Sequence, residues 1–248
     1  MTHQPLISIV TITYNAAKEL PPTMKSVAQQ TCKDFEHLII DGASSDNTVE
    51  VARQLGTPQL KIISEPDKGL YDAMNKGLRH AQGKYVVFLN AGDAFHSADV
   101  LLKYAEACKA NADIIYADTV IVDDSRKVIA PRHLSAPGQL TFQSFSKGML
   151  VCHQAFMVKK VLTPMYDTRY RFSADYDWTV KCILNTQPNH CVNLNIIAID
   201  YLADGTTDKN KWKSLIERFK IMCRHYGVAK TIGRHLSFVQ RAIKRKSI

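Results

Sequence analysis

The sequence predicts an α/β protein built on a mostly parallel β-sheet that is covered by helices. Short apolar, β-branched segments alternate with amphipathic segments as far as Tyr116, which is the pattern of successive βα units. The first segment, Leu6–Thr13, is β-branched and nearly continuous, as expected for a strand buried on both faces. Polar residues follow the strands, at the edge where open parallel sheets bind ligands.

The first half of the chain divides cleanly into strands and helices. A helix is expected at Glu19–Gln30. Prolines 21 and 22 fall in its first turn, where a helix tolerates proline. Asp46 or Asn47 can cap a second helix that ends at Leu55. Further strands are expected at 35–41, 60–64, 85–89 and 113–116, and further helices at 70–81 and about 97–110.

The second half is less regular. We expect a strand pair within 118–132, a loop at 133–150, a short strand at 152–158, a helix at 175–184 and a strand at 192–202. Beyond it, apolar residues recur at helical spacing: Trp212, Leu215, Ile216, Phe219, Met222 and Tyr226, then Ile232, Leu236, Val239 and Ile243. The predicted organisation is a catalytic domain at 1–205 and a basic, amphipathic helical extension at 206–248.

Composition narrows the class of protein. A chain of 248 residues with 46% hydrophobic content can bury the core of one domain. Its six cysteines are scattered and form no CxxC pair, which disfavours a structural zinc site and suits a reducing compartment. We find no signal-peptide pattern and no apolar stretch long enough to cross a bilayer, so we expect a cytoplasmic protein.

The net charge of +9 is concentrated at the end of the chain. From Lys209 onward there are twelve Lys and Arg residues and one acid, Glu217. Basic amphipathic helices favour contact with an anionic membrane, which would place the protein peripherally on the inner face of the membrane. The alternative is that the apolar stripe packs on the domain. A nucleic-acid-binding module is disfavoured, because the charge is confined to the tail and no known motif is present.

Four polar clusters follow successive strands: Tyr14–Asn15, Asp41–Gly42, Glu65–Gly69 and Asn90–Asp93. Each alone is typical of a turn, but their recurrence at one sheet edge favours a ligand site. An aromatic ring, carboxylates and Lys68 suit the base, ribose and phosphates of a nucleotide diphosphate. Because no GxGxxG or P-loop motif is present, a divalent cation is expected beside the phosphates, and Asp93 is a suitable oxygen ligand.

The second half offers further candidates. Asp175 and Asp177 lie at a helix start, where capping and the helix dipole favour carboxylates, but such a carboxylate can also act as a general base. His153 begins a short apolar segment, where it is either a structural histidine or a contact to metal, phosphate or acceptor.

These motifs together resemble family 2 of the inverting glycosyltransferases, which have the GT-A fold. The resemblance covers roughly residues 5–205 and is closest to bacterial enzymes that build capsules, exopolysaccharides and lipopolysaccharide, such as the colanic acid enzymes. It rests on six segments in order: Ile7–Asn15, Asp41–Thr48, Glu65–Gly77, Phe88–Asp93, His153–Gln154 and Ala174–Asp177.

The resemblance implies a role for each matching residue. The donor is expected to be a nucleotide-diphosphate sugar, usually a uridine diphosphate sugar, and the acceptor a saccharide or lipid-linked hydroxyl. Asp175 matches the catalytic aspartate, and Asp93 would bind Mg²⁺ or Mn²⁺. The expected donor-binding residues are Tyr14, Asn15, Asp41, Asp67 and Lys68, and the candidates for an acceptor or phosphate contact are His153 and Asp177.

The sequence departs from the family pattern at two positions. The metal motif is usually Asp-x-Asp, often followed by another Asp, whereas Asn90-Ala-Gly-Asp93 keeps only the last of these carboxylates. Ala174 stands where many relatives have Glu. Two rival functions remain. A nucleotidyltransferase would show a Gly-rich loop and a basic residue after the first strand, and Tyr14–Asn15 provides neither. A catalytically inactive nucleotide-sugar-binding scaffold would have lost Asp93 or Asp175, and both are present.

Overall fold

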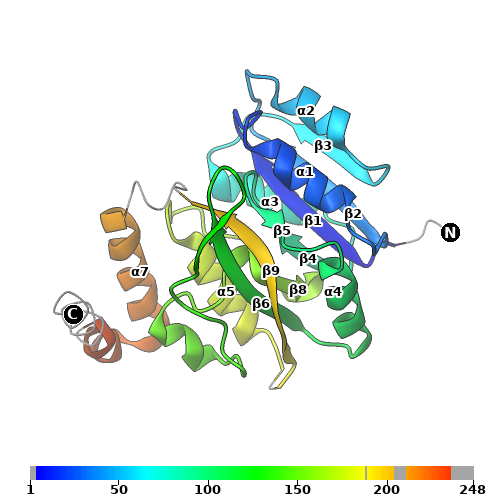
Figure 1. Cartoon of the computed structure of the whole chain (residues 1–248). Helices are drawn as coiled ribbons and strands as arrows, with labels where there is room; N and C mark the ends of the chain where they lie inside the picture. The colour runs from blue at the N-terminus through cyan, green and yellow to red at the C-terminus, as the bar shows by residue number, and fades with distance from the viewer. Residues whose placement is uncertain (1–3, 188, 204–210, 236–248) are drawn as a thin grey trace.

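A computed structural model describes residues 4–187, 189–203 and 211–235. These residues form one nine-stranded sheet with helices packed against it (Figure 1). The strands are β1 (Ile7–Thr13), β2 (Phe35–Asp41), β3 (Leu60–Ser64), β4 (Tyr85–Phe88), β5 (Ala94–Phe95), β6 (Ile114–Val122), β7 (Val128–Pro131), β8 (Phe156–Lys159) and β9 (Cys191–Leu202). The α-helices are α1 (Leu20–Ala28), α2 (Thr48–Leu55), α3 (Leu70–His80), α4 (Val100–Lys109), α5 (Ala174–Leu184) and α7 (Lys211–Tyr226), and residues 228–235 are also helical.

The strand order is β3-β2-β1-β4-β8-β6-β9-β5, with β7 paired to β6. The first four strands are all parallel, as the alternating βα pattern predicts. β8 is antiparallel to both β4 and β6, so the sheet becomes mixed in its second half. This follows from the connection: β6 turns back into β7, and the chain then returns to insert β8 between β4 and β6.

Strand β1 is buried on both faces, which is why its sequence is nearly continuous in β-branched residues. Val10 and Ile12 face a core shared with α3, α5 and α7, whereas Ile7 and Ile9 face a core shared with α1 and α4. The sheet therefore separates two apolar layers, and the predicted α/β class is confirmed.

The structure corrects one expected strand. The apolar run after Leu150 begins with a 3₁₀ turn, His153–Ala155, and β8 starts only at Phe156. His153 and Gln154 are both buried, and each is hydrogen-bonded to a residue of another segment. A continuous apolar run does not distinguish a strand from a buried turn. The expected loop at 133–150 contains a 3₁₀ helix, Phe142–Lys147, and the two-residue β5 was not expected.

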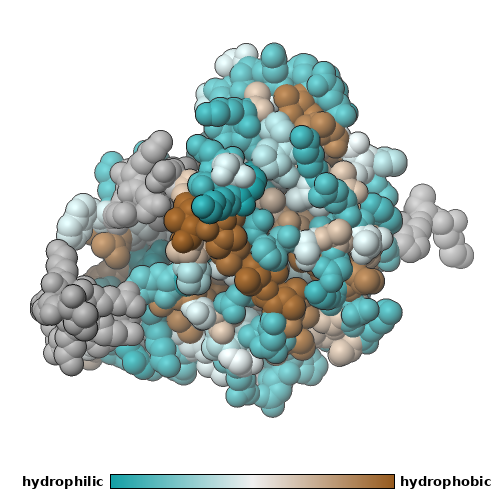
Figure 2. All heavy atoms as spheres, in the orientation of Figure 1, coloured by the Kyte–Doolittle hydropathy of each residue, from teal (hydrophilic) through white to brown (hydrophobic). Residues whose placement is uncertain are grey.

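On the face shown in Figure 2, a band of apolar residues runs along β9, and smaller apolar groups lie elsewhere on the surface. Within the described residues, no helix has the length and apolar character needed to cross a membrane.

Candidate active site

The ends of β1, β2 and β4 bring the polar clusters to one edge of the sheet. Thr13 and Asp41 are register partners at the ends of β1 and β2. On the other side of β1, β4 leads into the Asn90–Asp93 turn. The parallel register therefore produces the shared edge that the sequence predicts.

Asp41 is a fully buried carboxylate that holds this edge together. It accepts hydrogen bonds from Thr13 Oγ1 (2.9 Å) and Ser64 Oγ (2.7 Å), and from the backbone N–H (2.9 Å) and hydroxyl (2.5 Å) of Ser44. Burial raises the pKa of Asp41, but these hydrogen bonds outweigh burial and keep the pKa below its usual value. The ionised carboxylate thus lies beneath the loop that follows β2 and fixes its path.

Tyr14 and Asp67 converge on Gly42. A Cβ atom added to Gly42 would lie 2.4 Å from Asp67 Oδ2 and 3.3 Å from Tyr14 Cδ2. A side chain at Gly42 would therefore collide with the Asp67 carboxylate and crowd the Tyr14 ring. Tyr14 is 68% exposed, so its ring is available to stack on a planar ligand. The structure thus brings together two of the predicted donor-binding residues.

Asn15 and Lys68 lie on the loops that flank this pair. Asn15 has a left-handed backbone (φ 49°), and its side-chain oxygen accepts a hydrogen bond from the N–H of Ser45 (2.9 Å). Asn15 therefore joins the loops after β1 and β2. The Lys68 N–H donates to Asp72 Oδ2 (3.0 Å), and its side chain is exposed.

Asp93 lies at the end of the Asn90–Asp93 turn and is only 5% exposed. Its Oδ2 accepts a hydrogen bond from Gln154 Nε2 (2.7 Å), and its Oδ1 accepts one from the N–H of Leu202 (3.0 Å). Burial raises the pKa of Asp93 to about 7, and the hydrogen bonds and the positive charge of Arg126 only partly oppose this rise. A bound cation would supply the compensating charge that this carboxylate lacks.

A second oxygen of the same turn fits a cation. Asn90 Oδ1 is buried and has no hydrogen-bond partner in the described part of the chain. Within the same residues, no group of three or more His, Cys, Asp or Glu side chains is arranged to hold a metal. Asp93 and Asn90 therefore fit as two protein donors to an ion whose other ligands come from the substrate, and not as a complete protein cage.

Asp175 lies in the first turn of α5 and is partly exposed. Tyr71 of α3 donates a hydrogen bond from its hydroxyl to Asp175 Oδ1, at 3.2 Å. Burial, followed by the Asp175 charge, raises the pKa of Tyr71 well above its usual value, so Tyr71 remains a donor at neutral pH. Since α3 begins directly after the Asp67–Gly69 segment, this bond connects Asp175 to the Tyr14–Asp67 pair.

His153 is buried behind this region. Its Nε2 lies 2.5 Å from the hydroxyl of Tyr166, and its ring stacks on Phe88 at 5.1 Å between centroids. Burial lowers the pKa of His153 to about 4, so the ring is neutral at neutral pH. The predicted phosphate contact could therefore come only from a neutral imidazole.

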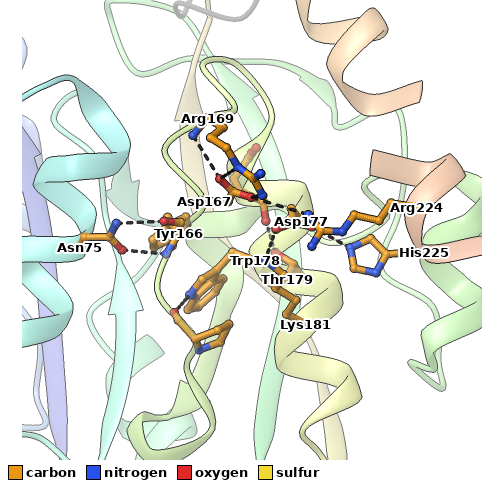
Figure 3. A network of polar contacts seen from close by, with 12 residues as sticks. Asn75, Tyr166, Asp167, Arg169, Asp177, Trp178, Thr179, Lys181, Arg224 and His225 are labelled. Carbon is orange, nitrogen blue, oxygen red and sulfur yellow. Dashed lines mark hydrogen bonds and ion pairs between the residues drawn. The ribbon is translucent and has the colours of Figure 1, made fainter. Parts of the chain in front are cut away.

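Asp177 lies against His225 of α7 (Figure 3). Its carboxylate is fully buried between His225 Nε2 (2.7 Å) and Lys181 Nζ (2.5 Å). Burial raises the pKa of Asp177, but the hydrogen bonds from His225 and Lys181 outweigh it and lower the pKa overall. Both of these partners are protein side chains, so the geometry favours a structural role over the expected acceptor contact.

Helix α7 packs against the catalytic domain. Ile221 and Met222 are buried in the same core cluster as α3 and α5. Glu217 accepts hydrogen bonds from the N–H groups of Arg171 (2.9 Å) and Phe172 (2.7 Å), directly before α5. Because of this packing, we propose that the folded domain extends through α7, beyond the expected boundary at residue 205. Residues 206–210 and 236–248 of the predicted extension lie outside the described residues.

Sequence reasoning assigned no role to Tyr71 or Gln154, although both occur in the quoted motifs. What distinguishes them is a hydrogen bond to a residue distant in the sequence. Tyr71 donates to Asp175, and Gln154 donates to Asp93, which is 61 residues away. Arg126, whose charge acts on Asp93, was also missed, because it lies in a hairpin that carries no family motif.

Comparison with known proteins identifies the family of the chain. The model of glycosyl transferase family 2 matches residues 8–163. The PGL/p-HBAD biosynthesis glycosyltransferase of Mycobacterium bovis (strain BCG / Pasteur 1173P2) is 32% identical over 224 residues, which cover 85% of this chain and 84% of that protein. The UDP-Glc:alpha-D-GlcNAc-diphosphoundecaprenol beta-1,3-glucosyltransferase WfgD of Escherichia coli is 24% identical over 219 residues, covering 88% of this chain and 85% of WfgD.

Among solved structures, S. aureus TarS 1-349 in complex with UDP superposes with a TM-score of 0.71. The match has 17% sequence identity and covers 94% of this chain and 72% of TarS 1-349, so it supports the fold. The fold is that of the GT-A glycosyltransferases. The chain belongs to glycosyl transferase family 2 and is a glycosyltransferase.

Proposed function

We propose that this protein transfers a sugar from a uridine diphosphate sugar to a hydroxyl of a saccharide or lipid-linked acceptor, in the synthesis of a bacterial surface polysaccharide or glycolipid. The observation that carries the proposal is the hydrogen bond from Tyr71 to Asp175, because it connects a carboxylate to the segment bearing Asp67 and Lys68. The relatives support the same class of substrates: WfgD is named for a UDP-sugar donor and a lipid diphosphate acceptor.

In the proposed reaction, Asp175 is the general base. The acceptor oxygen forms a bond to the anomeric carbon while the bond from that carbon to the diphosphate oxygen breaks. Asp175 takes the hydroxyl proton, and Tyr71 holds Oδ1 of the carboxylate. Attack opposite to the leaving group inverts the configuration of the anomeric carbon.

The donor is assigned to the edge formed by β1 and β2. The exposed ring of Tyr14 would stack on the base, Asp67 would accept hydrogen bonds from base or ribose, and Lys68 would face the phosphates. Asp41 and Asn15 would act by fixing the loops after β2 and β1.

Asp93 and Asn90 would hold Mg²⁺ or Mn²⁺ together with the donor diphosphate. When bound, the cation stabilises negative charge on the leaving diphosphate. Two solved structures with the same fold, described with Mn²⁺ in their complexes, support this part of the proposal. Asp93 would remain ionised beside such a charge.

A donor panel tests the function. The purified protein is incubated with UDP-glucose, UDP-galactose, UDP-N-acetylglucosamine and GDP-mannose, with saccharide and polyprenyl-diphosphate-linked acceptors, and release of nucleoside diphosphate is measured. We expect acceptor-dependent UDP release from one UDP-sugar. Release from GDP-mannose alone would contradict the uridine assignment, and binding of donors without turnover would favour the inactive scaffold.

We also propose that the protein acts in the cytoplasm and binds the inner face of the membrane through α7 and the following helical segment. Trp212 is 81% exposed, and Leu215 and Ile216 of α7 are also exposed, whereas Ile221 and Met222 of the same helix are buried. The predicted apolar stripe is thus partly packed and partly exposed. Exposed basic side chains accompany it: Lys213, Lys220, Arg224 and Lys230.

Vesicle binding tests the membrane proposal. Because Trp178 is fully buried and Trp212 is exposed, a blue shift of tryptophan fluorescence would report insertion of Trp212. We expect the shift, and co-sedimentation, with anionic vesicles, and loss of both at high salt. Ile216→Ser should weaken binding, whereas Leu184→Ser, at an exposed position of α5, should not. Equal binding to neutral vesicles, or none to either, would contradict the proposal.

A further inference from the structure

The turn between β6 and β7 presents an arginine beside the candidate metal turn. Asp123 Oδ1 accepts hydrogen bonds from the N–H groups of Ser125 (2.9 Å) and Lys127 (3.0 Å), and the Arg126 N–H donates to the carbonyl oxygen of Asp123 (2.9 Å). These bonds fix the path of the turn. They therefore also fix the point from which the side chain of Arg126 leaves the backbone.

Arg126 occupies a backbone conformation that suits glycine or asparagine better than arginine. Its φ is +67°, in the left-handed region, where a Cβ atom is unfavourable. The hairpin would form more easily with glycine or asparagine at this position. A strained residue of this kind points to a function for its side chain.

The guanidinium of Arg126 has buried donors that meet no acceptor in the described part of the chain. Within the residues that the structure describes, its Nε and Nη1 are buried and donate no hydrogen bond. Burying a charged donor without an acceptor is costly, so such a group is expected to meet an anion. The guanidinium is well suited to phosphate, because it keeps its positive charge and carries several N–H donors.

The fold places this turn next to Asp93. Val122, at the end of β6, is the register partner of Leu202 in β9, and the N–H of Ala203 donates to the Val122 carbonyl (2.9 Å). The N–H of the same Leu202 donates to Asp93 Oδ1 (3.0 Å). In Figure 1 the green β6–β7 hairpin lies beside the yellow β9. The hairpin therefore begins one strand away from the turn assigned to the metal and diphosphate.

We propose that Arg126 binds the diphosphate of the nucleotide-sugar donor through its unpartnered guanidinium donors. This inference rests on the proposed function. When the bond between the anomeric carbon and the diphosphate oxygen breaks, its electron pair stays on that oxygen, and Arg126 donates hydrogen bonds to the resulting charge. The sugar goes to the acceptor oxygen and the proton to Asp175, so Arg126 itself is not altered.

Arg126→Asn is the informative variant. Asparagine tolerates the left-handed conformation, so we expect the melting temperature to stay equal or to rise while diphosphate binding falls. Binding of UDP, UMP and uridine is measured by calorimetry, with Mg²⁺ present and no acceptor. We expect Arg126→Asn to weaken UDP binding by about 10-fold or more, the order expected for a charge-assisted hydrogen bond, and to leave uridine binding unchanged. Lys127→Gln, which removes an exposed charge from the same turn, should have little effect.

The outcomes separate this inference from the proposed function. If the native protein does not bind UDP, the proposed function is wrong. If it binds UDP and Arg126→Asn binds UDP equally well, Arg126 does not bind the donor diphosphate, and a raised KM for a phosphate-bearing acceptor would then assign it to the acceptor. An equal loss of UDP and uridine binding would also overturn the inference, because it would indicate a disturbed pocket.

Discussion

Replacing His153 by glutamine is expected to make the protein less sensitive to acid. His153 is buried between Phe88 and the hydroxyl of Tyr166, and burial lowers its pKa to about 4. In the unfolded chain its pKa returns to about 6.5. Between these two values, only the unfolded state carries the proton.

The sign and size of the effect follow from this difference. Because the unfolded state binds more protons between pH 6.5 and pH 4, the free energy of unfolding decreases as the pH falls through this range. A shift of about 2.5 units corresponds to about 3 kcal/mol, present in full above pH 6.5 and lost near pH 4. His37, which is also buried with a pKa near 4, contributes a similar loss in every variant and cancels in the comparison.

Urea unfolding at several pH values between 7.5 and 4 measures this effect. We expect the native protein to lose about 3 kcal/mol more than His153→Gln over this range. The comparison uses the change with pH, since the substitution also alters packing at pH 7.5. His80→Gln, at an exposed position of α3, is the control and should match the native protein. Equal pH dependence of His153→Gln and the native protein would refute the neutral, buried state of His153.

Three further variants test the site. Tyr71→Phe removes the hydroxyl that donates to Asp175 at 3.2 Å and should lower kcat about 10-fold, with unchanged UDP affinity. An unchanged kcat would show that Tyr71 does not position the base. Glu217→Ala removes the two hydrogen bonds that hold the segment before α5, and should lower stability by about 2 kcal/mol in thermal unfolding, whereas an independent α7 would leave stability unchanged. Asp93→Ala should weaken UDP binding with Mg²⁺ far more than without it, and full activity of the native protein in excess chelator would contradict the role of the Asn90–Asp93 turn.

The sequence was most informative where local pattern and fold agree. Residues 7–13 are mostly β-branched because they form one buried strand, and the polar residues that follow lie at the end of that strand. Both features were predicted. The parallel register then brings Tyr14, Gly42 and Asp67 together without further information. Motifs at strand ends could therefore be located before the structure was known.

Contacts between segments distant in the sequence could not be predicted. The apolar stripe of residues 212–226 predicts a helix, but its spacing does not show that Ile221 is buried while Ile216 is exposed. The same applies to Asp175 and Asp177, which share one helix turn and one residue type. Asp175 accepts a hydrogen bond from Tyr71 of α3, and Asp177 is buried against His225 of α7; both of these neighbours lie on other helices and not in the local sequence.

The central claim is that Asp175 is the base of a single-displacement glycosyl transfer. The most direct measurement compares native protein and Asp175→Asn on the preferred donor and acceptor, with UDP binding measured in parallel. Asparagine keeps the shape of the side chain, but its neutral amide cannot act as a general base. We therefore expect kcat to fall by about 10²–10⁴-fold. UDP affinity should be unchanged. Near-native turnover of Asp175→Asn would contradict the account.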